Sequence, residues 1–145
     1  MKIALAADHG GFRLKDKLVA HLQAKGVETV DFGTNSADSV DYPDYAHPLC
    51  EAVASGECDF GVLVCSTGIG MSMAANKHKG IRAACCSETI SAGLTRAHNN
   101  ANVLCLGEFI VGEHTAAEMV DIFISTPFSE GERHVRRINK VNSLD

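Results

Sequence analysis

The stretch VLVCSTGIG, residues 62–70, joins a short apolar run to a turn that contains two glycines. Its first four residues carry no polar side chain apart from a thiol, which is typical of a strand buried on both faces of a parallel sheet. Gly68 and Gly70 lack side chains, so backbone N–H groups at the start of a helix can face an anion there. We therefore predict a strand over residues 60–65, a tight turn, and a helix over residues 69–76.

Short apolar runs alternate with helix-patterned segments through the rest of the chain. We predict strands over residues 2–7, 27–32, 60–65, 81–86 and 102–106. A first helix is expected from the spacing of Leu14, Leu18 and Leu22, with Gly26 as its left-handed stop. Further helices are expected over residues 45–55, 69–76 and 88–98 and around 116–123, followed by a polar, helix-compatible tail at about 128–145. This alternation predicts the α/β class, with a mainly parallel five-stranded sheet covered on both faces.

Length and composition indicate one domain over residues 1–145, because 145 residues fit a single core and no repeat or linker interrupts them. The apolar run before Asp8 is too short for a signal peptide. The longest uncharged stretch, residues 60–76, is interrupted by polar residues and falls short of the roughly 20 apolar residues of a membrane helix. We expect a cytoplasmic protein with no membrane partner.

The net charge of −5 argues against nucleic acid as a partner. Although the chain is acidic, three of its six arginines lie close together in the tail: Arg133, Arg136 and Arg137. Arg133 and Arg137 are four residues apart, so they share a helical face and could hold a phosphate group. A charge run is usually only solvated, but this clustering favours a phosphate site. The tail follows the last strand and helix, so it would reach a site by crossing to a neighbouring subunit, which predicts a dimer.

The six cysteines, at positions 50, 58, 65, 85, 86 and 105, form no C-x-x-C pair. None of the seven histidines stands at a zinc-finger or H-E-x-x-H spacing. We therefore expect reduced thiols and no metal. A thiol-based redox or metal protein remains a third hypothesis.

The reactive residues follow the predicted strands. Cys65 stands beside the N–H groups of the turn, which favour its thiolate, and the turn could hold the enediolate that a base creates next to a carbonyl. An isolated strand cysteine is more often a core residue, but the adjacent glycine turn reverses that preference. His9 and His98 are candidates for opening a sugar ring, since both follow elements that we expect to end near the crevice. Asp8 could orient a histidine, bind a hydroxyl, or simply cap a helix.

A non-catalytic nucleotide-binding module is the alternative from another class. Glu88 lies about 20 residues after the glycine turn, where a ribose-binding acid would stand. However, Met73 occupies the place of the third glycine of a dinucleotide fingerprint, and the Gly-Lys-Ser/Thr ending of a phosphate loop is absent.

Six segments together resemble the type B ribose-5-phosphate isomerases, the family that also includes allose- and galactose-6-phosphate isomerases. They are AADHGGFRLK, DYPDYA, VCSTGIGMSMAANK, GIRAA, AHNNANVLCLG and GERHVRR, and they span nearly the whole chain. The resemblance implies a Rossmann-like three-layer α/β/α sandwich and no metal or organic cofactor. It also implies a small sugar phosphate as substrate and homodimers with shared active sites, with a dimer of dimers as an alternative.

The resemblance also assigns roles to individual residues. It makes Cys65 the base that moves a proton between C1 and C2, and His98, helped by Asp8, the group that opens the ring. The enediolate would be held by Thr67 and the backbone of Ser66, Gly68, Ile69 and Gly70. Sugar hydroxyls would be contacted by Tyr42 and Asn99, and the phosphate would be held by His9, Arg133 and Arg137.

Two positions bear on how this chain fits the family. Some members use a glutamate just after the second glycine as base; Met71 stands there, so Cys65 has no rival. Many members carry an arginine where this chain has Phe109, which implies fewer phosphate contacts, or a replacement by Arg136. We expect the interconversion of ribose 5-phosphate and ribulose 5-phosphate, with allose or galactose 6-phosphate as the alternative substrates.

Overall fold

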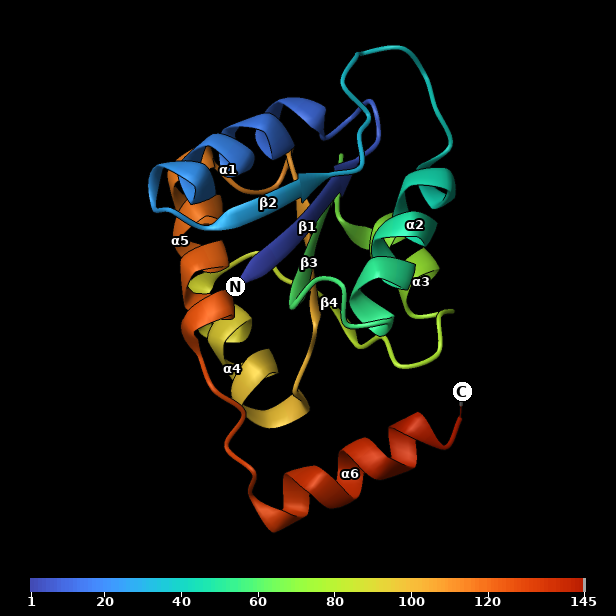
Figure 1. The fold of residues 1–145 in the computed structure, drawn as a ribbon, viewed down its shortest axis with the longest axis vertical. Coiled ribbons are helices and arrows are strands. Elements are labelled where there is room, and N and C mark those ends of the chain that lie inside the picture. The colour runs from blue at the N-terminus through green and yellow to red at the C-terminus, as the bar shows by residue number, and fades with distance from the viewer. Residues whose placement is uncertain (145) are drawn as a thin grey trace.

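The computed structural model describes residues 1–144, which form a parallel five-stranded sheet between two layers of helices (Figure 1). The strands are β1 (Lys2–Ala7), β2 (Glu28–Asp31), β3 (Phe60–Cys65), β4 (Ala83–Cys85) and β5 (Val103–Gly107). Their order in the sheet is β2-β1-β3-β5-β4, and every neighbouring pair is parallel. The predicted α/β class, the three layers and the five strands are confirmed.

Helices cover the sheet unequally. The helices are α1 (Phe12–Ala24), α2 (Tyr42–Ala54), α3 (Ile69–Ala75), α4 (Thr89–Asn99), α5 (Glu113–Ser125) and α6 (Glu132–Asn142). Buried residues of α1, α4 and α5 pack on one face of the sheet, and those of α2 and α3 pack on the other. The helices reach 13 residues at most, and none within residues 1–144 could span a membrane.

Two apolar clusters result from the alternation of side chains along the strands. In β3, Val62 and Val64 point to the layer of α1, α4 and α5, whereas Leu63 and Cys65 point to α2 and α3. All four are buried, as expected for a central strand covered on both sides. The first cluster is closed by Phe123 of α5, which is fully buried.

The strand order creates a switch point between β1 and β3. From β1 the chain moves outward through α1 to β2, and from β2 it returns through α2 on the opposite face to β3. In open parallel sheets, the carboxyl ends of the two strands at such a point border a crevice that no helix covers. Here Asp8 directly follows β1, and Cys65 is the last residue of β3.

Two elements differ from the sequence-based expectation. Helix α2 begins at Tyr42, three residues before the predicted start, because Pro43 lies in its first turn, where a missing N–H costs nothing. Strand β4 covers residues 83–85 rather than 81–86, since it is an edge strand that pairs with β5 alone. The N–H of Ile81 instead bonds to a turn carbonyl, that of His78.

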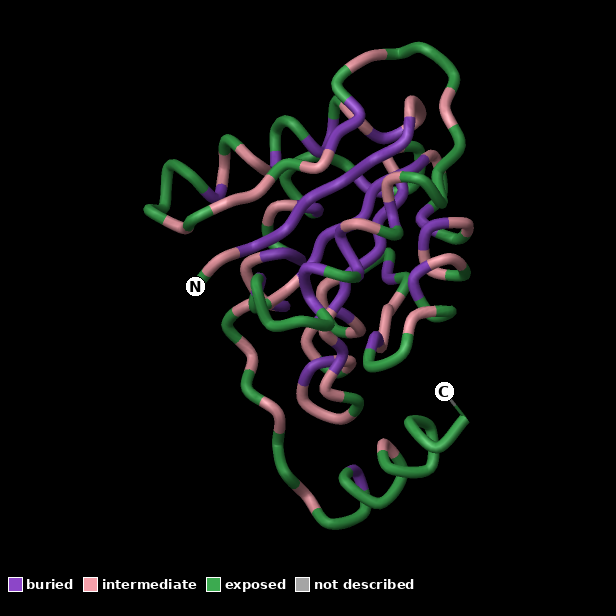
Figure 2. The backbone as a smooth tube through the Cα atoms, turned by 45° about the vertical axis from the view of Figure 1, so that its right-hand side comes forward, coloured by how far each residue is buried: buried purple, intermediate pink, exposed green. Residues whose placement is uncertain are grey.

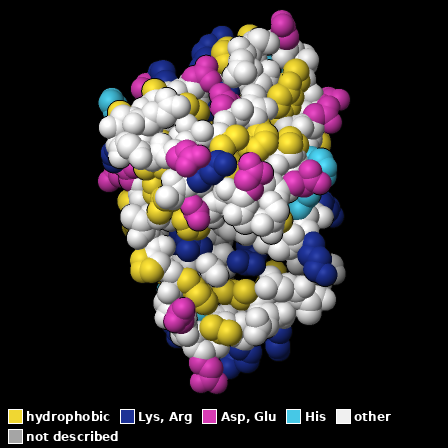
Figure 3. Space-filling model, in the orientation of Figure 1, with side chains coloured by type: hydrophobic (Ala, Val, Ile, Leu, Met, Phe, Trp, Pro, Cys, Tyr) yellow, Lys and Arg dark blue, Asp and Glu magenta, His cyan; other side chains and the backbone are white. Residues whose placement is uncertain are grey.

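Helix α6 lies apart from the layered body, at the amino-terminal end of the strands (Figure 1). It is exposed along most of its length, and His134 is its one buried residue (Figure 2). Figure 3 shows hydrophobic and basic side chains together over this lower end of the molecule. The half-buried Ile138 and the exposed Val135 and Val141 supply apolar surface there.

Candidate active site

Cys65 is the last residue of β3, and its side chain is 5% exposed. The backbone N–H of Gly68 donates a hydrogen bond to Cys65 Sγ at 3.0 Å. Gly68 reaches this position with φ of +79°, a conformation that glycine adopts without strain. A backbone N–H aimed at a sulfur is the arrangement that stabilises negative charge on it. Cys65 thus packs in the cluster of α2 and α3 and also accepts a backbone N–H of the glycine turn.

The turn after Cys65 is open on one side. Thr67 is exposed, and its Oγ1 accepts the N–H of Ile69 at 3.3 Å. A Cβ added at Gly70 would lie 3.1 Å from Tyr42 Cζ, so the ring of Tyr42 lies against the second glycine. The first N–H groups of a helix have no acceptor within it, and in α3 these begin at Ile69. The turn, the start of α3 and the Tyr42 ring thus lie together at the carboxyl end of β3.

Met71 follows this turn but is fully buried. Its side chain packs with the cluster of α2 and α3. The position where the resemblance places a glutamate in some members therefore belongs to the core in this chain.

Asp8 follows β1 and is 8% exposed. Its Oδ1 accepts the N–H of Gly10 at 2.8 Å, and its own N–H donates to Val64 O at 3.2 Å. The N-cap of α1 is Gly11, and no side chain caps that helix start. The interpretation of Asp8 as a helix cap is therefore wrong. Its carboxylate instead accepts a backbone N–H of the loop that lies beside β3.

Gly10 and Gly11 bring that loop onto the end of β3. A Cβ at Gly10 would lie 2.2 Å from Ser66 Oγ, and a Cβ at Gly11 would lie 2.5 Å from Val64 C. A side chain at Gly11 would therefore collide with the backbone of β3, and one at Gly10 would require the Ser66 side chain to move. Sequence analysis did not select them, although the glycine pair directly after a strand was a usable signal.

His9 lies in the same loop and is half-buried. Its Nδ1 accepts the backbone N–H of Val40 at 3.2 Å. A nitrogen that accepts cannot carry a proton, so the neutral ring holds its proton on Nε2. His9 thereby offers an N–H donor at the carboxyl edge of the sheet, near Ser66 and Cys65.

The end of β5 and the residues that follow it contact the glycine turn after Cys65. A Cβ at Gly107 would lie 2.7 Å from Thr67 Cα, and the N–H groups of Glu108 and Phe109 donate to the carbonyls of Cys65 and Ser66. The Phe109 ring itself is 75% exposed. The position where many family members carry an arginine therefore lies beside the turn, with a free side chain.

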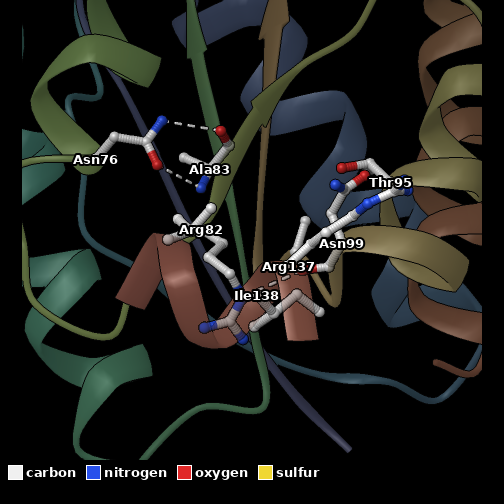
Figure 4. Close-up of a pocket in the computed structure, with 9 residues that line it drawn as sticks. Asn76, Arg82, Ala83, Thr95, Asn99, Arg137 and Ile138 are labelled. Atoms are coloured by element: carbon white, nitrogen blue, oxygen red, sulfur yellow. Dashed lines mark hydrogen bonds between the residues drawn. The ribbon is translucent and has the colours of Figure 1, made fainter. Parts of the chain in front are cut away.

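The remaining predicted residues lie at the other end of the sheet. Helix α4 runs from the carboxyl edge back to the amino edge, so His98 and Asn99 at its C-terminal end are far from Cys65. The expectation that His98 ends near the same crevice is therefore wrong within one chain, and Asp8 does not approach it. Figure 4 shows Asn99 and Arg137 lining a cavity of about 250 Å³ at that end.

His98 and its neighbours on α6 form a second, compact group. The rings of His98 and His134 stack, with centroids 4.4 Å apart and planes inclined by 4°. Arg133 Nε donates to His134 Nε2 at 3.3 Å. Burial lowers the pKa of His134, and the positive charges of His98, Arg133 and Arg137 lower it further. His134 thus contacts both His98 and Arg133, in surroundings that favour its neutral form.

Arg136 does not share the face of Arg137. It borders a separate open groove on the outer side of α6, together with Val135 and Lys140. Within one chain it therefore does not take over a place beside Asn99 and Arg137.

The other cysteines differ in their surroundings from Cys65. Burial raises the pKa of Cys50 to about 12 and that of Cys105 well above its ordinary value, so both remain thiols. All six cysteines are unpaired. Within residues 1–144, histidine, cysteine and carboxylate side chains form no group of three that could hold a metal ion.

Glu88 has a structural task. Its carboxylate caps α4 by accepting the N–H groups of Ile90 and Ser91 at 2.6 and 2.8 Å. The hydrogen bonds from Ser91 lower the pKa of Glu88. The carboxylate that a nucleotide-binding module would use for ribose is therefore engaged in a cap.

Known proteins share both the sequence and the fold. A family described as Ribose/Galactose Isomerase matches residues 3–141. Ribose-5-phosphate isomerase B from Escherichia coli is 48% identical, over 99% of this chain and 96% of its own length. The Thermotoga maritima ribose 5-phosphate isomerase structure is 51% identical with a TM-score of 0.96, covering 98% and 97% of the two chains. A Mycoplasma genitalium ribose-5-phosphate isomerase B with bound ribulose-5-phosphate gives a TM-score of 0.93 at 41% identity, covering 99% and 95%.

Proposed function

Because this chain belongs to the ribose/galactose isomerase family, it is an aldose–ketose isomerase, and we propose that it interconverts D-ribose 5-phosphate and D-ribulose 5-phosphate. The observation that carries the proposal is the hydrogen bond from Gly68 N–H to Cys65 Sγ at the switch point of the sheet. It gives the sulfur a backbone hydrogen-bond donor at the carboxyl end of β3, the edge of an open parallel sheet where ligands bind.

In the proposed reaction the Cys65 thiolate takes the proton from C2 of the open-chain aldose. The electrons of that C–H bond form the C1–C2 double bond of an enediolate, and the negative charge moves to oxygen. Thr67 and the backbone of residues 66–70 stabilise that oxygen charge. The hydroxyl proton then passes from O2 to O1, so that the negative charge lies on O2. The Cys65 thiol returns its proton to C1, which leaves a carbonyl at C2 and a hydroxyl at C1 and restores the thiolate.

We propose that a second copy of the chain completes the site. Cys65 and His9 lie at the carboxyl edge of the sheet, whereas His98, Asn99 and Arg137 lie at the amino edge. Ring opening and phosphate binding therefore need the second group from a neighbouring molecule. Helix α6 favours this arrangement, because its exposed apolar and basic side chains suit burial against a partner.

We further propose a cytoplasmic location and a role in pentose phosphate metabolism. Six unpaired cysteines suit a reducing compartment, and the proposed substrate and product are both pentose phosphates.

The test compares wild-type protein with Cys65→Ala and Cys85→Ser. Ribose 5-phosphate, allose 6-phosphate and galactose 6-phosphate are assayed side by side. Cys85 is the matched control, because it is an exposed thiol whose Sγ lies against the same turn, 3.7 Å from Thr67 O. We expect Cys65→Ala to lose turnover while ribose 5-phosphate still raises its melting temperature, and Cys85→Ser to stay active. An unchanged kcat in Cys65→Ala would remove the base assignment, and a preference for a hexose phosphate would replace the proposed substrate.

A further inference from the structure

Lys15 is fully buried, which is rare for an ammonium group. Its Nζ donates to both carboxylate oxygens of Asp31, at 2.8 and 2.7 Å, and to Asn35 Oδ1 at 2.8 Å. Asp16 Oδ1 lies 3.1 Å from the same nitrogen, but its side chain is 53% exposed. A buried charge is tolerated only when such partners replace water. The Lys15 anchor is therefore a fixed point, defined here as Lys15, Asp31 and Asn35.

The anchor joins three segments that are separate in sequence. Lys15 stands in the second turn of α1, Asp31 ends β2, and Asn35 lies in the loop of residues 32–41 that follows. That loop arches over the carboxyl end of the sheet (Figure 1). Lys15 thus holds the first residues of the loop against the helix that follows Asp8 and His9.

The beginning of the loop is fixed beside β1. Asp31 Oδ1 also accepts the N–H of Gly33 at 2.8 Å. Gly33 O accepts the N–H of Ala7, and Thr34 N–H donates to Ala7 O, at 2.7 and 2.8 Å. Ala7 directly precedes Asp8, so the carboxylate held by Lys15 sets where the loop leaves the sheet.

The far end of the loop contacts two residues of the proposed site. Val40 donates its N–H to His9 Nδ1, which leaves the proton of the neutral ring on Nε2. Asp41 is the N-cap of α2, and the next residue, Tyr42, lies against Gly70 of the glycine turn. The loop therefore fixes the ring of His9 directly and the place of Tyr42 through the start of α2.

We propose that Lys15 is a positioning residue for the isomerase reaction: through Asp31 and Asn35 it sets the loop that orients His9 and Tyr42 over the substrate. The proposal rests on the proposed function and on the roles that the family resemblance gives to His9 at the phosphate and to Tyr42 at the sugar hydroxyls. Lys15 itself is enclosed in protein and touches no substrate. Its effect falls on substrate binding more than on the proton transfer at Cys65.

The test uses Lys15→Met and Asn35→Ala, with Asp16→Asn as the matched control. Asn35 is exposed, so its truncation removes one contact of the anchor with little risk to folding. Asp16→Asn changes a carboxylate that touches Lys15 without reaching the loop. Each variant is examined by ¹⁵N NMR of labelled histidine, by titration with inorganic phosphate, and by steady-state kinetics with ribose 5-phosphate.

We expect both anchor variants to lose the fixed Nε2–H tautomer of His9 and to bind phosphate more weakly. Their KM should rise by about tenfold or more, with a smaller change in kcat, while Asp16→Asn behaves as wild type. Unchanged His9 signals and unchanged KM in Asn35→Ala would overturn the proposal, whether or not Lys15→Met folds. If the wild-type protein itself fails to isomerise ribose 5-phosphate, the proposed function fails, and the His9 signals still decide whether the anchor sets that ring.

Discussion

The imidazole of His98 lies flat on that of His134, with ring centroids 4.4 Å apart and planes inclined by only 4°. This stack is a contact between α4 and α6 that includes the one buried residue of α6. Burial lowers the pKa of His134 below its ordinary value of 6.5, and positive neighbours lower it further. The docking of α6 is therefore linked to pH.

The sign of this link follows from the two states. Between the lowered pKa of folded His134 and about 6.5, the unfolded chain binds more protons than the folded chain. The contribution of His134 is therefore complete above that range and is lost as the pH falls through it. We expect the melting temperature to fall as the pH drops below about 6.5, measured by thermal unfolding in buffers of constant ionic strength.

His134→Phe isolates this effect, since phenylalanine keeps the ring on His98 but takes up no proton. Its melting temperature should depend less on pH than that of the wild type. His114→Asn is the control, because His114 is exposed on α5. If the melting temperatures of His134→Phe and the wild type depend equally on pH, protonation of His134 does not cause the loss of stability in acid.

Gly68 and Gly80 provide a second, matched prediction. Both have φ of +79°, but a Cβ at Gly68 would lie 3.0 Å from Cys85 Sγ and from Leu106 C, whereas a Cβ at Gly80 meets nothing within 4 Å. Gly80→Ala should lose only the cost of that conformation, about 1–2 kcal/mol, and keep kcat. Gly68→Ala should lose more stability and most of kcat, because the N–H moves away from Cys65 Sγ. Denaturant unfolding measures the stability of both variants, and steady-state kinetics measures their kcat. A fully active Gly68→Ala enzyme would contradict the role given to the Gly68 N–H.

The fold was readable from the sequence because its signals are local. Alternating apolar runs and helical stripes predict β1, β3 and the helices, and Gly26 ends α1 with φ of +74° as expected. The predicted boundaries were less accurate where the local signal was weak. Strand β4 is an edge strand and is shorter than predicted, and α2 begins earlier than predicted because its first turn contains Pro43.

The site was only partly readable, because its geometry depends on contacts between distant segments. Cys65 and its turn follow from one stretch of sequence. The contact of Val40 with His9 and the approach of Gly10 to Ser66 arise only when separate loops meet. The error about His98 was avoidable, since in an alternating β/α chain the C-terminal end of each helix returns to the amino edge of the sheet.

Phe109 offers a gain-of-function prediction. Its ring is 75% exposed, and its N–H is bonded to Ser66 O of the glycine turn. Phe109→Arg restores the arginine to which the family resemblance assigns a phosphate contact, so KM for ribose 5-phosphate should fall by about three- to tenfold, with the gain reduced by salt. Phe109→Gln is the control for loss of the ring without added charge. A KM that is unchanged, or that falls equally in both variants, would show that position 109 does not face the phosphate.

The separation of Cys65 from His98 makes shared sites testable by mixing variants. Cys65→Ala and His98→Asn should each be inactive alone. In a mixed dimer, one site combines both substitutions, and the other combines an intact Cys65 with an intact His98 from the partner chain. Random exchange makes half the dimers mixed, each with one complete site of two, so activity should recover to about a quarter of the wild-type value.

The matched control for this experiment pairs Cys65→Ala with Thr67→Ala. Both substitutions lie in the same turn, so each site of a mixed dimer carries one of them, and mixing should restore nothing. The comparison therefore depends only on which end of the sheet each residue occupies. Recovery in both mixtures would point to an exchange artefact, and recovery in neither, with exchange verified by mass spectrometry of the intact dimers, would mean that Cys65 and His98 do not work in one site across two chains.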